Sequence, residues 1–212
     1  YSGMKGYADK AANYLTVGSS FGQIAVAVLG ALLITGEYSS GQIRSSLAAV
    51  PRRGRLFAAK AVVVTIFSAL LGLVTVALTY LLSLPILGDK AGSLSNPEYL
   101  GFFWGTAMAF AIIGLMAMSF GYILRSTAGS ISLVVVLLFV LLIPLGLAAS
   151  KWDWVRYITE VLPSSSAAAV ADPYNLLATP TKLDYDVVIA AGYAWAIIPM
   201  IIAFFVFSKR DA

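Results

Sequence analysis

The chain has 212 residues, of which 60% are hydrophobic and only 11% are charged. A soluble domain carries about 25% charged residues, and a mean hydropathy of +0.89 excludes water as the main solvent of this protein. Because the chain has no cysteine and no histidine, disulfides, thiolate chemistry and imidazole metal ligands are excluded. The formal net charge of +4 does not indicate nucleic acid, because the basic residues gather at the ends of apolar segments.

Five apolar segments are long enough to cross a membrane as helices. A helix rises about 1.5 Å per residue, so a hydrocarbon core of about 30 Å takes roughly 20 residues. Pro85 is expected to end the second segment because it cannot donate a helical hydrogen bond. A short polar turn at 125–130 separates the third segment from the fourth. We therefore predict an all-α, polytopic transmembrane bundle that forms a single domain over 1–212, with spans at 17–36, 61–84, 99–124, 131–149 and 187–208.

The distribution of lysine and arginine predicts the orientation of the bundle. Short cytoplasmic loops hold an excess of these residues, and the loop 37–60 and the C-terminal tail are both basic. We therefore expect 37–60 and the C-terminus inside, with 1–16 and 150–186 outside the cell. An additional span upstream of Tyr1 would give six spans with both ends inside, and we expect that sixth span.

The outer loop 150–186 is predicted to contain short helices. Residues 151–158 mix tryptophan and tyrosine with charges, which is typical of a segment lying at the headgroup boundary. Leu162-Pro163 and Asp172-Pro173 indicate breaks between short external helices or turns.

The four spans after residue 60 contain no aspartate, glutamate, lysine or arginine. Ionisable residues inside a membrane mark proton relays and ion pathways, so proton-coupled transport loses its usual carriers. An intramembrane protease also needs a base or a pair of carboxylates. Ser119, Ser130 and Ser132 have no activating partner in the sequence, and their hydroxyls are expected to bond to nearby carbonyls. We expect no enzymatic activity in this chain.

The third span has small residues spaced for close helix packing. Gly101, Gly105 and Ala109 share one face at i, i+4 and i+8, which favours packing within one subunit over a dimer seam. Aromatic residues of the same span are candidates for an apolar substrate path, although rings that face lipid are the more ordinary explanation. The candidates are Phe103, Trp104, Phe110 and Phe120.

The loop 37–60 contains a predicted amphipathic helix. Ser39 and Gln42 have the spacing of a capping box, and an apolar stripe at i, i+4 and i+7 follows before a proline. The helix could rest on anionic lipid, which holds each arginine by about 1 kcal/mol, or it could dock on a protein. Glu37 has three roles open to it, which are capping the helix, pairing with a base at a partner interface, or remaining solvated. The stripe and its terminator are Ile43, Leu47, Val50 and Pro51.

This loop resembles the hallmark of type-2 ATP-binding cassette (ABC) exporter permeases. The residues that carry the resemblance are Glu37, Gly41, Ile43, Leu47, Pro51, Arg53 and Lys60. The resemblance extends to the outer segment before the first visible span, the short turn after the third span, the external helices and the basic tail. The family's first span and its cytoplasmic amphipathic helix are not in the sequence. By resemblance, the loop is a coupling helix that binds a nucleotide-binding subunit through Glu37, Gly41, Ile43, Arg44, Leu47, Val50, Pro51, Arg52 and Arg53.

The resemblance implies a permease subunit in a bacterial plasma membrane that exports an apolar or amphipathic small molecule, such as a drug or antibiotic. Peptide export or self-immunity and the export of a lipid-linked cargo are alternatives, and a scaffold or sensor that transports nothing is the rival from another class. The chain has no GxxxxGK[ST] phosphate loop and is expected to hold no cofactor. ATP and Mg²⁺ would bind to two copies of a partner subunit, beside a second permease subunit that is identical or similar.

Overall fold

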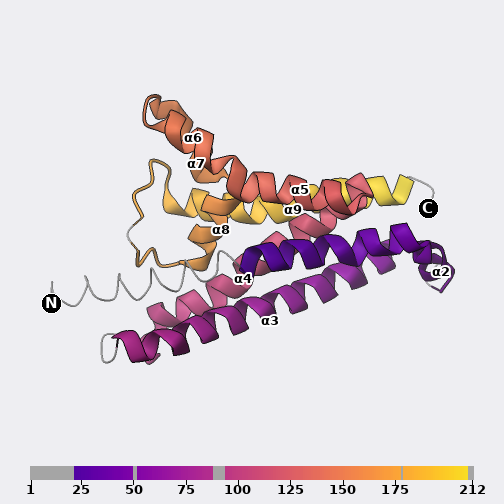
Figure 1. Ribbon diagram of the computed structural model, residues 1–212, viewed down its shortest axis with the longest axis horizontal. Helices are drawn as coiled ribbons and strands as arrows, with labels where there is room; N and C mark the ends of the chain where they lie inside the picture. The colour runs from indigo at the N-terminus through magenta and orange to yellow at the C-terminus, as the bar shows by residue number, and fades with distance from the viewer. Residues whose placement is uncertain (1–21, 50–51, 88–93, 178, 210–212) are drawn as a thin grey trace.

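The computed structural model describes residues 22–49, 52–87, 94–177 and 179–209, and every regular element in these ranges is helical. Five helical segments are long and apolar enough to cross a membrane (Figure 1). They confirm the five predicted spans and make the chain an all-α membrane protein. The five segments are Gly22–Ser40, Arg53–Pro85 in α3 (Arg53–Leu87), Pro97–Leu124 (α4), Thr127–Ala149, and Tyr185–Lys209 (α9).

The connection between the first two spans is more helical than the sequence predicted. The first helix continues to Ser40, α2 occupies Gln42–Ala49, and α3 already begins at Arg53. Residues 53–60 are mostly arginine, alanine, leucine and lysine, which are strong helix formers. The second span ends at Pro85, as predicted, although the helix α3 itself continues to Leu87. A proline in the last turn removes one helical hydrogen bond near an end that is already partly unpaired.

The turn before the fourth span is shorter than predicted. Arg125 takes a left-handed conformation with φ of 51° and closes the C-terminus of α4. The Ser126 side chain then accepts a hydrogen bond of 3.2 Å from the Gly129 amide and caps the next helix, which begins at Thr127. An N-capping serine satisfies one of the free amides of a first turn, and this is why residues 127–130 are helical.

The fourth span is bent in its middle. It consists of α5 (Thr127–Val135), the π-helical turn η2 (Val136–Val140) and α6 (Leu142–Ala149). Pro144 has no amide to donate to the carbonyl of Val140, and the Leu141 amide bonds instead to Val136 O at 2.9 Å. A π-turn beside a proline is a recognised cause of a kink, and α6 leans away from the bundle (Figure 1).

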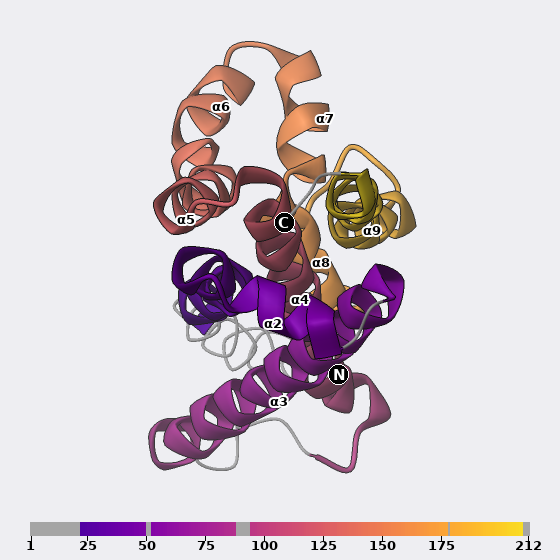
Figure 2. The ribbon, with the colours of Figure 1, turned by 90° about the vertical axis from the view of Figure 1, so that its right-hand side faces the viewer.

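α4 forms the core of the bundle. In its most apolar window 72% of residues are buried, against 11% to 33% in the other four spans. Glycines allow the neighbouring helices to approach it closely: a Cβ at Gly30 would lie 2.6 Å from Gly114 O, and one at Gly72 would lie 2.9 Å from Ala107 Cα. α4 is therefore surrounded by the helix Gly22–Ser40, α3, α5, α8 and α9 (Figure 2).

The segment 150–186 contains two short helices with different environments. α7 (Asp153–Val161) exposes Trp154 and Tyr157 and buries Val155, as expected for a helix at a membrane surface. α8 (Pro163–Ala171) instead packs against α4 and α9 and is mostly buried. A Cβ at Gly105 would lie 2.6 Å from Val170 O. The small-residue face of α4 therefore packs within the subunit, as the sequence favoured.

The charged side chains of the described residues gather at the two ends of the bundle. The end that includes α2 and the C-terminus of α9, here called the basic end, has Arg44, Arg52, Arg53, Arg55, Lys60, Arg125 and Lys209 against Glu37. The opposite end, here called the acidic end, has Glu98, Asp153, Glu160, Asp172, Asp184 and Asp186 against Lys151, Arg156 and Lys182. This asymmetry is the pattern on which the orientation of membrane proteins depends.

Candidate functional site

α2 lies across the basic end of the bundle (Figure 2). The chain turns at Gly41, whose φ of +73° is readily adopted by glycine and rarely by other residues. The predicted capping box is wrong, because Ser39 still belongs to the preceding helix and its hydroxyl donates to Gly36 O at 3.0 Å. The break falls at Gly41 rather than at Ser39, so α2 starts directly after the glycine.

The apolar stripe of α2 packs against this chain's own spans. Ile43 is 3% exposed, and Leu47 packs partly buried beside it. Full burial of such a side chain stabilises by about 1.5–3 kcal/mol relative to water. Ile43 therefore holds α2 against the spans and is not exposed for a partner to contact. The buried residues around it, here called the basic-end cluster, come from four spans and are Ile34, Phe57, Val64, Met118, Tyr122, Ala203 and Phe207.

The opposite face of α2 is open. Arg44, Ser45 and Ala48 are exposed, and Arg52 and Arg55 are exposed on the chain that follows. Of the residues predicted to contact a partner, the structure therefore leaves Gly41, Arg44 and Arg52 exposed. Val50 and Pro51 lie outside the described residues.

Glu37 and Lys60 form an ion pair inside the chain. Lys60 Nζ lies 2.5 Å from Glu37 Oε2, with the two side chains 11% and 23% exposed. Neither atom has a further hydrogen-bond partner among the described residues. None of the three roles considered for Glu37 anticipated this pair, which joins the end of the first helix to the first turns of α3.

Two arginines fasten other parts of the same end. Arg53 Nη1 donates to Phe207 O at 3.0 Å in the last turns of α9, where a positive charge is favoured by the helix dipole. The Arg125 guanidinium lies 4.8 Å from the centre of the Tyr38 ring, within the range of a cation–π contact. Arg53, predicted as a partner-binding residue, thus contacts the chain itself and is half-buried.

The candidate substrate-path aromatics do not converge in the structure. Phe110 is 1% exposed in the core of α4, where it meets the helix Gly22–Ser40 and α3. Trp104 is 45% exposed and touches Tyr174 at the acidic end. Phe103 packs on Tyr80, whereas Phe120 packs against a different cluster, whose buried residues include Ala27, Val134 and Leu138. A substrate path lined by these four residues stays a prediction.

The sequence did not predict the aromatic contacts of the basic-end cluster. The Phe57 and Phe207 rings lie 5.0 and 4.9 Å from the Tyr122 ring, which joins α3, α9 and α4. A hydrogen bond of 2.8 Å between Thr127 and Thr35 ties the start of α5 to the first helix. α4 and α9 are apolar on all sides, so no periodicity marks the faces that meet.

The comparison with known families places almost the whole chain in one group. Residues 5–212 match the family described as "Protein of unknown function (DUF2705)". The chain belongs to this family. The description states no activity, so it neither supports nor opposes a transporter. No curated protein matches the chain. Among the described residues, no three histidine, cysteine, aspartate or glutamate side chains gather to hold a metal ion.

Proposed function

We propose that this DUF2705 member is the permease subunit of a type-2 ABC exporter and that α2 is its coupling helix. The observation that supports this most is that one face of α2 is packed against the spans while the other is exposed. Its inner face is buried in the basic-end cluster, which unites the helix Gly22–Ser40, α3, α4 and α9, while its outer face is exposed and basic. A helix fixed on one side and open on the other can pass a partner's movement to the spans.

The proposed mechanism follows from this attachment. Two ATP-binding subunits bind ATP and Mg²⁺ and close on each other, and each presses on the outer face of one α2. Because Ile43 and the Glu37–Lys60 pair join α2 and its neighbours to the spans, that movement becomes a tilt of the bundle. A second permease subunit, identical or similar, completes the path, and the two bundles alternate between inward and outward states.

The proposal requires the basic end to face the cytoplasm. The chain has no cysteine, so a single introduced cysteine reports its own side of the membrane. Ser45 and Ser150 are matched sites, because each is exposed and each hydroxyl donates to the carbonyl three residues earlier at 2.8 and 2.7 Å. We expect an impermeant maleimide added to intact cells to label Ser150→Cys and not Ser45→Cys. External labelling of Ser45→Cys would place α2 outside and end the proposal.

The docking of α2 can be tested on its outer face. Ser45→Trp puts a large ring between Arg44 and Ala48 without touching the buried stripe. If a partner covers this face, the ring should weaken assembly about tenfold to hundredfold, which is roughly 1.4–2.7 kcal/mol. The measurement is co-purification of the proposed ATP-binding subunit, to be sought in the neighbouring reading frame, together with ATPase stimulation by the permease.

The control for this experiment is Ser150→Trp, which adds the same ring at the acidic end. It should retain the partner and the stimulated ATPase. If Ser45→Trp retains both as well, then α2 is not the docking helix. If the partner binds the wild type but its ATPase responds to no cargo, the scaffold or sensor is the better explanation.

We still expect the cargo to be an apolar or amphipathic small molecule, such as a drug or antibiotic. The uncharged interior of the four spans after residue 60 supports this class over a polyanion. Export of a peptide or of a lipid-linked molecule would use the same coupling.

A further inference from the structure

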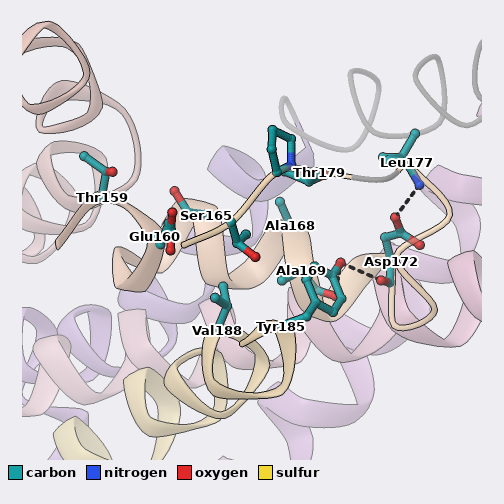
Figure 3. Close-up of a pocket in the computed structure, with 12 residues that line it drawn as sticks. Thr159, Glu160, Ser165, Ala168, Ala169, Asp172, Leu177, Thr179, Tyr185 and Val188 are labelled. Carbon is teal, nitrogen blue, oxygen red and sulfur yellow. Dashed lines mark hydrogen bonds between the residues drawn. The ribbon is translucent and has the colours of Figure 1, made fainter. Parts of the chain in front are cut away.

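The acidic end contains a pocket of about 340 Å³ between the end of α7, α8, the start of α9 and the segment that connects α8 to α9 (Figure 3). This volume lies within the range of about 300–1,000 Å³ that is usual for small-molecule sites. Alanines of α8 and Val188 of α9 give it an apolar side, and hydroxyl groups give it a polar one. The lining residues are Thr159, Glu160, Ser165, Ala168, Ala169, Asp172, Leu177, Thr179, Pro180, Thr181, Tyr185 and Val188.

Two carboxylates lie at opposite ends of this pocket (Figure 3). Asp172 is 2% exposed, and its two oxygens accept hydrogen bonds of 2.9 Å from the amides of Leu176 and Leu177. The two oxygens of Glu160 accept from the amides of Lys182 and Leu183 at 2.8 and 2.9 Å. These bonds hold both carboxylates in place, and each oxygen keeps a lone pair for another donor.

No positive side chain neutralises these carboxylates from within the pocket. The residues that line it include no lysine or arginine. Lys182, whose backbone amide bonds to Glu160, directs its Nζ to Asp153 at 2.6 Å, and Asp153 is not among the lining residues. Burial raises the pKa of Asp172 above its ordinary value, against the opposing effect of the two amides. A cation in the pocket would favour the charged form of this carboxyl.

We propose that the pocket binds a small organic amine, with its ammonium group on Asp172 or Glu160 and its apolar body against the alanines of α8. An organic cation fits better than a metal ion, because the carboxylates lie at opposite ends and no metal-binding group of three occurs in the described chain. Charge-assisted hydrogen bonds from an ammonium are about twice as strong as neutral ones. The inference goes beyond the proposed transport function and does not depend on it.

The test uses the full chain in lipid nanodiscs, with tryptamine as the probe and tryptophol as its neutral match. Titration calorimetry, corrected with empty nanodiscs, should show saturable binding of tryptamine and at least about tenfold weaker binding of tryptophol, a difference of about 1.4 kcal/mol. Neither ATP nor a partner subunit is needed. A failure here therefore leaves the exporter proposal unaffected, and the reverse also holds.

Three variants locate the binding in the pocket. Asp172→Asn and Glu160→Gln remove one charge each, and at least one of them should weaken tryptamine binding about tenfold. Ala168→Trp fills the pocket from an exposed position of α8 without changing the charge, and it should abolish binding. Because Asp172 also orders the loop after α8, Glu160→Gln and Ala168→Trp decide the outcome if Asp172→Asn does not fold.

Two controls leave the pocket intact. Asp186→Asn removes an exposed charge at the same end, and Ser150→Trp adds the same ring elsewhere at that end. Both should bind tryptamine as the wild type does. Equal tryptamine binding by all variants, or equal binding of tryptamine and tryptophol, would overturn the proposal.

Discussion

Gly105→Leu is expected to prevent α8 from packing on α4 and to leave little folded protein. A Cβ at this position would lie 2.6 Å from Val170 O and 2.8 Å from Ala171 O, and real Cβ contacts do not come so close. Both neighbours are backbone atoms at the end of α8, so no side chain can rotate away. We expect a loss of about 3 kcal/mol or more in the free energy of unfolding.

The measurement is the unfolding midpoint in mixed detergent micelles, together with the monodisperse fraction after gel filtration. Gly146→Leu is the matched control, because nothing lies within 4 Å of a Cβ there and α6 exposes this face. Leucine also forms helices better than glycine, by up to about 1 kcal/mol. Equal stability of the two variants would mean that α8 does not pack against the glycine face of α4.

The positions of the spans could be predicted because membrane thickness fixes the length of an apolar helix. Their ends could not, since helix propensity and capping decide them locally. The segment from Arg53 to Lys60 is charged enough to be taken for a loop, yet its residues form helix well and α3 begins there. In the same way, the capping serine at Ser126 starts the fourth span earlier than its apolar content indicates.

The existence of α2 also followed from the sequence, whereas the surface that it covers did not. An apolar stripe shows that one face of a helix is buried but not which body buries it. From the sequence, Ile43 could be buried in a partner's groove or against this chain's own spans, and in the structure it packs against the spans. The ion-pair partner of Glu37 was missed for a related reason. The chain turns at Gly41, and Lys60, which lies far from Glu37 in sequence, meets it in space.

The burial of α8 could not be predicted from its sequence. Its sequence is small and weakly polar, with Pro163, three serines and several alanines, and such a composition suits an exposed turn as well as a tightly packed helix. Burial of α8 depends on Gly101 and Gly105 of α4, which are distant in sequence. The position of α8 is fixed only by the packing of its small residues on those of α4. Neither sequence alone shows that these two surfaces meet.

Lys60→Met is expected to destabilise the basic end by about 3 kcal/mol, because it leaves the Glu37 carboxylate largely buried without its partner. The pair is 2.5 Å long, and its two side chains are 11% and 23% exposed. Removing both charges together should cost much less than the sum of the single changes, since no buried charge remains. We expect a coupling energy of at least about 1 kcal/mol between Glu37→Gln and Lys60→Met.

The cycle is measured as unfolding in mixed micelles for the wild type, the two single variants and the double variant. Additive effects would show that the pair contributes nothing beyond its separate side chains. Partner binding then separates the two roles of Glu37. If Glu37 serves only the chain, the double variant should recover both stability and the ATP-binding subunit, because α2 is again held by an intact end. If Glu37 also contacts the partner, the double variant should be stable yet fail to retain that subunit, and the carboxylate would then belong to both surfaces of the coupling site.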